Sequence, residues 1–383
     1  MPRLLIVDDE PDVEAMISQF LRRRVRSGEL DLIFAGDGFE ALEALERSGD
    51  VDLVLTDINM PGMDGLRLLG ELGERGYDLK TVVISAYGDM PNIRAAMNRG
   101  AFDFLTKPIE FEDLERTIDK SLAEMTKVRR AAHVEVELLD ARRIQQDLLP
   151  APAELADEPR LALGAAIAQA RDVGGDFYDF FRIGEDHVFV VIGDVSGKGL
   201  AAGILMAVTK ALTKAAALRC QGDPAAVLAE VNRALCVNNA SLHFVTMIAV
   251  LVDCRTGTVT IVNAGHEPAM LLGDGAEPQL FHAGAPPVGL VPDVTLSAEQ
   301  SQLAPDRMLL LVTDGLCDTV DPADNSFGRS AILTTLSGDG PSVGPDTVIN
   351  QLLKAAEAHR KGADQADDLA LVGLKWMGSS PAS

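Results

Sequence analysis

Acidic residues follow short apolar runs at two points in the first third of the chain. Asp8 and Asp9 follow LLIV, and Asp57 follows DLVLT. If these three carboxylates met, they would repel one another by about 4 kcal/mol per pair at roughly 4 Å and an effective dielectric near 20, unless cations offset them. Lys107, which follows FLT, and a bound Mg²⁺ would supply that positive charge. The pattern therefore predicts a magnesium site at which Asp57 could attack phosphorus.

The elements that would hold these residues alternate in type along residues 3–122. Five short apolar runs, typical of buried strands, alternate with five amphipathic stretches, typical of helices. This alternation predicts a doubly wound, five-stranded parallel sheet with helices on both faces. Ligands of such sheets bind at the carboxyl ends of the strands. The residues that fall there are Asp8, Asp9, Asp57, Ser85 and Lys107.

The motifs VDDE, DINMPGMDG, ISAYG and FLTKP together resemble the receiver domain of two-component response regulators. The resemblance implies an α/β receiver over residues 1–122, with Asp57 as the phosphoacceptor and a sensor histidine kinase or phosphotransfer protein as the donor. Taken singly, an aspartate after a strand is more typical of a turn or a helix cap. The Mg²⁺ ligands implied by the resemblance are Asp8, Asp9, Asp57 and the main-chain carbonyl of Asn59.

The same resemblance implies a conformational switch built from Ser85, Phe104 and Lys107. On phosphorylation, the Ser85 hydroxyl would move to a phosphate oxygen. Phe104 would turn inward into the space that this movement releases. Whether phosphorylation activates or inhibits the rest of the chain is left open by the sequence.

Residues 114–149 contain neither Gly nor Pro and keep an apolar seam at seven-residue spacing. The seam consists of Ile118, Met125, Ala132 and Leu139, and Pro150 follows the segment. We expect a long helix with a weak coiled-coil tendency, and a linker over residues 123–150 through which two copies would form a parallel homodimer. An exposed single helix between domains fits the pattern nearly as well.

The stretch VVIGDVSGKG, residues 190–199, looks like a phosphate-binding loop but has the wrong spacing. A Walker loop needs four residues between its first Gly and the Gly-Lys pair, and then Ser or Thr. Here three residues separate Gly193 from Gly197, and Gly199 follows Lys198. The dinucleotide fingerprint also fails, because Gly203 comes one position late. Asp194 within this stretch therefore needs another explanation.

Asp194 belongs to a set of four aspartates at the ends of apolar runs in the second half of the chain. Oxygen ligands without His or Cys companions favour the hard ions Mg²⁺ or Mn²⁺ over zinc. Two such ions roughly 4 Å apart would polarise a bridging water and hold a phosphate ester for in-line attack, so no protein nucleophile is required. The four residues are Asp176, Asp194, Asp314 and Asp367.

The motifs RDVGGDFYD, GDVSGKGLAAG, FVTM, NAGHEP, LLLVTDG and DDLALV, preceded by IQQDLLP, resemble the PPM-type serine/threonine phosphatases. They are most similar to the bacterial SpoIIE/Rsb-like branch, whose members activate alternative sigma factors. The resemblance implies an α+β sandwich of α-β-β-α layers over residues 151–377, binding two Mn²⁺ or Mg²⁺ ions. The substrate would be a phosphorylated anti-sigma-factor antagonist of the STAS type. The implied catalytic metal ligands are Asp176, Asp194, Asp314, Asp367 and the carbonyl of Val195.

Charge and composition restrict the remaining possibilities. The 383 residues carry a formal net charge of −24, which opposes binding to nucleic acid. No apolar run of about 18 residues is evident, and the N-terminus leads straight into a predicted strand, so we expect a cytoplasmic protein without membrane attachment. Residues 378–383, GSSPAS, are expected to be a disordered tail.

These features predict a phosphorylation-regulated, metal-dependent protein serine/threonine phosphatase of a two-component system, acting in the control of an alternative sigma factor. The rival interpretation is a non-catalytic adaptor that sequesters or delivers a sigma factor or its anti-sigma partner. Mn²⁺-dependent cleavage of p-nitrophenyl phosphate would separate the two, because an adaptor has no turnover.

Overall fold

The computed structural model describes residues 1–86, 88–170, 173–237, 239, 242–273, 277–336 and 343–378. Contacts divide the chain into two compact units, Met1–Glu135 and Val136–Ser383, which are called unit 1 and unit 2 below. Of the predicted disordered tail, residues 379–383 lie outside the described residues.

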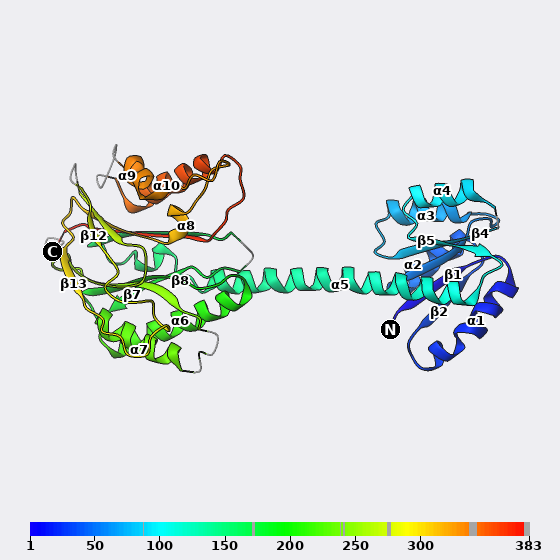
Figure 1. Cartoon of the computed structure of the whole chain (residues 1–383), viewed down its shortest axis with the longest axis horizontal. Coiled ribbons are helices and arrows are strands. Elements are labelled where there is room, and N and C mark those ends of the chain that lie inside the picture. The colour runs from blue at the N-terminus through cyan, green and yellow to red at the C-terminus, as the bar shows by residue number, and fades with distance from the viewer. Residues whose placement is uncertain are drawn as a thin grey trace. The chain divides into compact units, whose positions relative to one another are not determined.

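Unit 1 contains a five-stranded parallel sheet in the order β2-β1-β3-β4-β5, with helices on both faces (Figure 1). Alternate residues of β1 point to opposite faces, so Leu4 and Ile6 pack with α1 and α5 while Leu5 and Val7 pack with α2 and α3. This arrangement confirms the predicted doubly wound fold. The elements are β1 Arg3–Val7, α1 Pro11–Arg26, β2 Asp31–Ala35, α2 Gly38–Ser48, β3 Leu53–Asp57, α3 Gly65–Glu74, β4 Lys80–Ala86, α4 Met90–Asn98, β5 Asp103–Lys107 and α5 Phe111–Asp147.

The apolar residues predicted at seven-residue spacing along α5 lie in two different environments. Ile118 and Met125 are buried, with exposed fractions of 0% and 2%. Ile118 packs with Leu114 in the core of unit 1. Leu139, in contrast, is 50% exposed. The first half of the seam is thus buried in unit 1, whereas Leu139 in the second half is accessible for contact with another helix.

Unit 2 consists of two stacked five-stranded sheets with antiparallel pairing between neighbouring strands (Figure 1). Their orders are β13-β10-β9-β8-β7 and β12-β11-β14-β15-β6. Residues such as Val190 and Val250 of the first sheet and Leu311 and Val372 of the second fill the core between them. The elements are η1 Pro152–Leu155, β6 Leu161–Ala168, β7 Phe177–Ile183, β8 His187–Val195, α6 Leu200–Arg219, α7 Pro224–Cys236, β9 Val245–Asp253, β10 Thr258–Ala264, β11 Ala269–Leu272, β12 Gln279–Phe281, β13 Glu299–Gln302, β14 Met308–Val312, α8 Asp314–Cys317, α9 Gly328–Leu336, α10 Pro345–Arg360 and β15 Leu369–Trp376.

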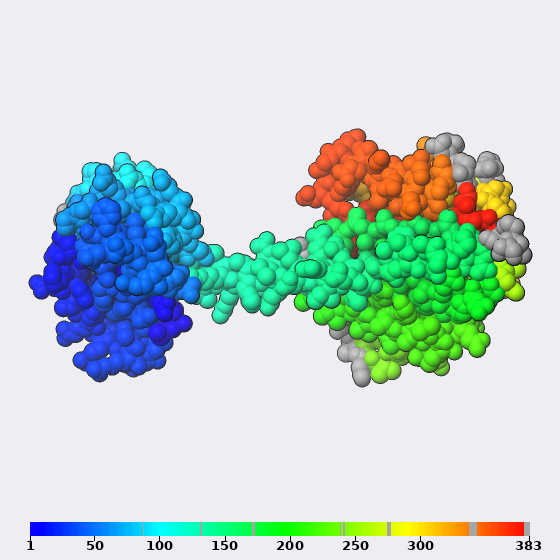
Figure 2. Space-filling model, turned by 180° about the vertical axis from the view of Figure 1, so that it is seen from behind, coloured from blue at the N-terminus to red at the C-terminus, as the bar shows by residue number. Residues whose placement is uncertain are grey.

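Helices cover the outer faces of both sheets. α6 and α7 pack on the first sheet, and α8, α9 and α10 pack on the second. Figure 2 shows the green atoms of α6 and α7 and the orange atoms of α9 and α10 on opposite sides of unit 2. This layering confirms the predicted α-β-β-α sandwich.

One helix departs from the expectation that the chain has no segment apolar enough to cross a membrane. Among the described residues, α6 alone meets the length and composition of a span, with a mean hydropathy of 1.4. Its buried residues include Met206, Thr213 and Ala217, and it packs on β7, β8 and α7. Packing in the sandwich therefore accounts for the buried 44% of the apolar segment, while Ile204 and Leu218 of α6 remain exposed.

Candidate phosphoacceptor and metal sites

The first candidate site lies at the carboxyl ends of the strands of unit 1. Asp8, Asp9 and Asp57 offer carboxylate oxygens that all lie within 4.8 Å of one another. Asp57 is buried and Asp9 is exposed, so the cluster opens to solvent on one side. Within the described part of the chain, no other three potential ligands meet this distance. The oxygen-only donor set fits Mg²⁺.

Lys107, the last residue of β5, supplies positive charge to this cluster. Its Nζ lies 2.6 Å from Asp57 Oδ2, 3.1 Å from Asp8 Oδ2 and 2.9 Å from Glu10 Oε1. Although burial opposes it, hydrogen bonding to these carboxylates raises the pKa of Lys107. Burial raises the pKa of Asp8 although hydrogen bonds from the Glu10 backbone and from Lys107 lower it, and the charge of Asp57 adds a smaller increase. Glu10, within the motif VDDE, was missed by the sequence reasoning.

Asn59 follows β3 closely enough to contact the candidate phosphoacceptor. Its backbone N–H donates to Asp57 Oδ1 at 3.1 Å. The structure therefore places Asn59 beside the carboxylate cluster, and metal binding by its carbonyl oxygen stays a prediction.

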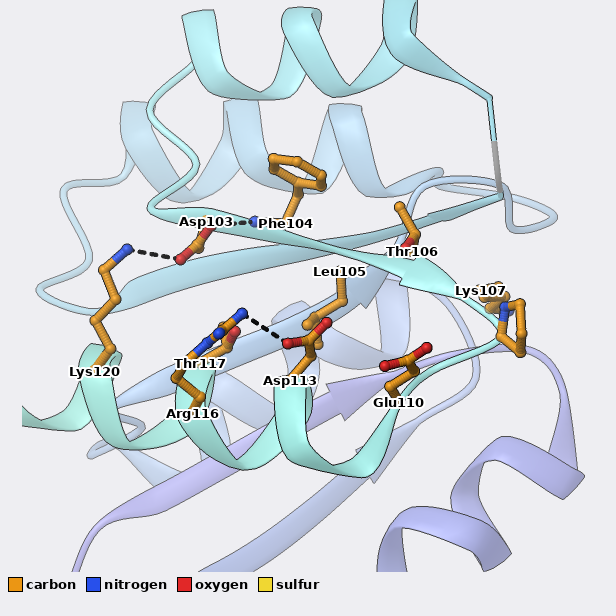
Figure 3. Close-up of a pocket in the computed structure, with 11 residues that line it drawn as sticks. Asp103, Phe104, Leu105, Thr106, Lys107, Glu110, Asp113, Arg116, Thr117 and Lys120 are labelled. Atoms are coloured by element: carbon orange, nitrogen blue, oxygen red, sulfur yellow. Dashed lines mark hydrogen bonds and ion pairs between the residues drawn. The ribbon is translucent and has the colours of Figure 1, made fainter.

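The two predicted switch residues lie on neighbouring strands with opposite exposure. Ser85 in β4 is fully buried, and its hydroxyl has no hydrogen-bond partner among the described residues. Phe104 in β5 is 39% exposed. Figure 3 shows Phe104 on the side of β5 that faces α4, whereas Leu105 points to the α5 side. The hydroxyl of Ser85 is thus free to form a new hydrogen bond. The conformational switch itself stays a prediction. Tyr87, in the motif ISAYG, lies outside the described residues.

A pocket lies between β5 and the first turns of α5 (Figure 3). Four of its charged residues form two ion pairs: Lys120 Nζ lies 2.8 Å from Asp103 Oδ2, and Arg116 Nη2 lies 2.6 Å from Asp113 Oδ1. These internal ion pairs leave the pocket without a strong charge of one sign.

The second candidate site lies in unit 2, where the ends of strands from both sheets meet. Asp176 precedes β7, Asp194 lies near the end of β8, Asp314 begins α8, and Asp367 precedes β15. Burial, and next the charge of Asp194, raises the pKa of Asp176 well above its usual value. Burial, and next the charge of Asp314, raises the pKa of Asp194 to about 7. The fold therefore brings the four predicted carboxylates into one electrostatically coupled group.

The outer members of this group face solvent. Desolvation, and next the charge of Asp367, raises the pKa of Asp314. The side chain of Asp367 is 46% exposed. Clustered carboxylates that shift one another in this way fit hard divalent ions. Among the described residues, no three carboxylates of this group lie within 4.8 Å of one another, so the group is more open than the cluster of Asp8, Asp9 and Asp57.

Asp368 was missed by the sequence reasoning, which assigned only the first aspartate of the motif DDLALV. Its buried carboxylate accepts hydrogen bonds from the backbone N–H groups of Gly175 at 2.9 Å and Ala170 at 2.8 Å. A Cβ at Gly174 would lie 2.1 Å from Asp368 Oδ2, so only glycine fits there. Asp368 thus holds the loop before β7 against the start of β15.

Glycine at position 175 allows the same loop to approach β8. A Cβ there would lie 2.9 Å from the carbonyl oxygen of Val195 and 3.3 Å from Asp194 Oδ1. The Val195 carbonyl accordingly lies beside the carboxylate group, and its role as a metal ligand stays a prediction.

Family models match both halves of the chain. Residues 184–377 match the model described as Stage II sporulation protein E (SpoIIE), and residues 4–119 match the response regulator receiver domain. The chain belongs to the SpoIIE family. Its SpoIIE domain is preceded by a receiver domain, as the motifs predicted.

Individual relatives agree with this assignment. Protein IcfG of Synechocystis sp. is 28% identical over 265 residues, which cover 62% of this chain and 41% of IcfG. Phosphoserine phosphatase RsbP of Bacillus subtilis is 27% identical over 238 residues, which cover 60% of this chain and 56% of RsbP. The chain thus spans about half the length of these curated relatives. The solved SiaA-PP2C domain of Pseudomonas aeruginosa shares the fold, with a TM-score of 0.58 at 22% identity, over 64% of this chain and 98% of that domain.

Two further residues of unit 2 hold the surroundings of the carboxylates in place, and both were missed from the sequence. Thr313 Oγ1 donates to Asp176 Oδ2 at 2.6 Å and accepts from Ala370 N at 2.8 Å. Gln145, at the end of α5, is buried and bonded to both backbone polar groups of Gly174. The motifs LLLVTDG and IQQDLLP contain these residues, but nothing local in them indicates these partners.

His266 in NAGHEP contacts Thr246, whose hydroxyl also donates to the carbonyl oxygen of Asp194 at 3.4 Å. Its Nδ1 lies 2.8 Å from Thr246 Oγ1, and its backbone N–H donates to Asn263 Oδ1 at 2.9 Å. Burial lowers the pKa of His266 to about 4, so it is neutral at pH 7. These contacts fit a turn-orienting role. Arg171, in the motif RDVGGDFYD, lies outside the described residues.

A hollow of about 10 Å³ lies among Asp194, Lys198 and Asp367. This is close to the volume of a single water-sized probe. A space of this size does not hold a nucleotide, in agreement with the failed Walker spacing.

Proposed function

We propose that the chain is a phosphorylation-regulated, metal-dependent protein serine/threonine phosphatase of a two-component system. The proposal is carried by the coupled group Asp176, Asp194, Asp314 and Asp367, of which the last three lie within the SpoIIE match of residues 184–377. RsbP, one of the relatives, is named a phosphoserine phosphatase, which supports phosphoserine as the substrate class.

The residues of the group have separate tasks in this reaction. Two Mn²⁺ or Mg²⁺ ions, held by these aspartates and the Val195 carbonyl, would supply a water of lowered pKa and offset charge on the phosphate. Asp176 is the most buried ligand and is held in place by Thr313. Asp314 and Asp367 line the solvent side, from which a phosphoprotein must approach.

The receiver domain supplies the regulation. A sensor histidine kinase or phosphotransfer protein would phosphorylate Asp57, with Mg²⁺ held by Asp8, Asp9, Asp57 and the Asn59 carbonyl. Ser85, Phe104 and Lys107 would then rearrange around the phosphoryl group. α5 begins in the receiver domain and ends at Gln145 and the SpoIIE site, so a change in α5 can alter that site.

The physiological partners follow from the same proposal. The substrate is a phosphorylated anti-sigma-factor antagonist of the STAS type, and the protein acts in the cytoplasm as a homodimer joined through residues 123–150. The free half of the α5 seam, including Leu139, supports the dimer.

The decisive experiment measures phosphate release from a phosphoserine peptide with and without Mn²⁺. The wild-type protein should show Mn²⁺-dependent turnover. Asp314→Asn should lose activity at least about 100-fold, because a metal ligand is removed. Asp306→Asn, an exposed aspartate outside the site, is the matched control and should stay within twofold. If the wild-type protein bound the phosphopeptide without turnover, the adaptor interpretation would replace this one.

A further inference from the structure

Lys198 lies in the turn between β8 and α6, and its side chain reaches Asp367 of the SpoIIE site. Its Nζ donates to Asp367 Oδ2 at 2.9 Å and to the carbonyl oxygen of Ala366 at 3.0 Å. Gly197 and Gly199, on either side, have φ values of 95° and 77°, a region that glycine readily adopts. The turn therefore presents the lysine side chain to the group of carboxylates.

Lys198 is the sole cation among the described residues that line the hollow. The remaining ionisable groups of the lining are Asp194, Asp367 and Asp368. A phosphorylated substrate is an anion, and these carboxylates would repel it. A lysine at this position can attract the phosphate and orient it.

The ion pair between Lys198 and Asp367 is weak, so Lys198 can readily bind another anion instead. Both side chains are close to half exposed, at 45% and 46%. Exposed ion pairs of this kind stabilise a protein by only about 0–1 kcal/mol. The lysine side chain is long and flexible, so its ammonium can turn from Asp367 to another anion without a change in the backbone.

We propose that Lys198 is a substrate-positioning residue: it neutralises Asp367 before divalent ions are bound, and afterwards its ammonium binds a phosphoryl oxygen of the substrate. This inference rests on the proposed phosphatase function and extends it to a residue that is not a metal ligand. Lys198 forms and breaks no covalent bond in this role.

The test compares Lys198→Gln with wild type in two calorimetric titrations of the full chain. In the first, Mn²⁺ alone is titrated, and the variant should bind it three- to tenfold more tightly because Asp367 has lost its internal counter-ion. In the second, inorganic phosphate is titrated into the Mn²⁺-loaded protein, and the variant should bind it at least tenfold more weakly. Lys198→Arg should keep phosphate binding within threefold of wild type. Lys354→Gln, on the exposed side of α10, removes the same charge elsewhere and should change neither titration.

The outcomes separate this inference from the proposed function. If wild type binds both probes and Lys198→Gln, folded by circular dichroism, matches it within twofold in both titrations, the role of Lys198 is wrong and the phosphatase proposal stands. If only Mn²⁺ binding changes, Lys198 is a counter-ion and the substrate-positioning role is overturned. If the wild-type protein takes up no Mn²⁺, the phosphatase proposal fails and this inference fails with it.

Discussion

Gln145 Nε2 donates to the carbonyl oxygen of Gly174 at 2.6 Å, and the N–H of Gly174 donates back to Gln145 Oε1 at 3.1 Å. The same Oε1 accepts from Gln169 Nε2 at 2.8 Å. The end of α5 is thereby joined to the loop that Asp368 holds from the other side. A side chain of the predicted linker is part of the scaffold of the SpoIIE site.

Gln145→Leu should loosen this loop. The substitution keeps the approximate size of the side chain but leaves buried polar groups of Gly174 without partners, at a cost of about 1–3 kcal/mol in the free energy of unfolding. Mn²⁺ binding should weaken severalfold because Gly175 and Asp368 lose their support. Urea unfolding and calorimetry measure the two effects. The exposed neighbour provides a matched control, Gln146→Leu, and an equal effect of both variants would contradict this role for Gln145.

The stability of the metal-free protein should depend on pH through Asp194. The pKa of Asp194 is about 7 in the folded protein, above the ordinary value of 3.8. Between these values the folded protein holds more protons than the unfolded chain, so the contribution of Asp194 is complete below about pH 4 and is lost as the pH rises through about 7. In EDTA, the melting temperature should therefore fall from roughly pH 5 to pH 8. The fall should be smaller in Asp194→Asn and unchanged in Asp306→Asn; parallel curves for wild type and Asp194→Asn would refute the assignment.

Ser85→Ala should leave phosphorylation of Asp57 intact but largely remove its effect on the phosphatase rate. The Ser85 hydroxyl makes no hydrogen bond among the described residues, so its removal should change the resting stability by less than about 1 kcal/mol. Acetyl phosphate should still label Asp57, as seen by gel shift, while the change in phosphatase rate on labelling should be largely lost. Asp57→Ala should show neither labelling nor rate change. A full response in Ser85→Ala would show that this hydroxyl is not part of the switch.

Leu139→Glu should weaken self-association. Leu139 is half exposed on the free part of the α5 seam, and a buried carboxylate at a helix interface is strongly unfavourable. Light scattering should give twice the chain mass of 40.8 kDa for wild type and the single mass for the variant. Leu218→Glu alters another exposed leucine, on α6, and should leave the dimer intact. A wild-type protein that scatters as a monomer at micromolar concentration would rule out the dimer.

The aspartates at the ends of strands show how much of a site can be predicted from short sequence segments. Asp8, Asp57 and Lys107 follow apolar runs, and any doubly wound sheet brings such positions to one edge. The fold class and the receiver site were therefore predictable from short segments. The two layers of the SpoIIE domain were predictable from the motifs, because the motifs identify the family.

Asp368, Thr313 and Gln145 could not be assigned in this way. Thr313 and Asp176 are 137 positions apart in the chain, and Asp368 and Gly175 are 193 apart. Nothing in a local motif states which backbone groups a side chain will meet across two sheets. Likewise, the seven-residue seam of α5 did not reveal that Ile118 and Met125 are buried within unit 1.

The sequence by itself determined the alternation of strands and helices in residues 3–122, the acidic residues available for metal binding and the absence of a nucleotide loop, because apolar periodicity and motif spacing are properties of neighbouring residues. Only the tertiary structure decided that Asp367 pairs with Lys198, that Asp368 anchors the loop before β7 and that Gln145 joins α5 to that loop. These contacts join distant segments, and their geometry is set by how the two sheets and their helices pack.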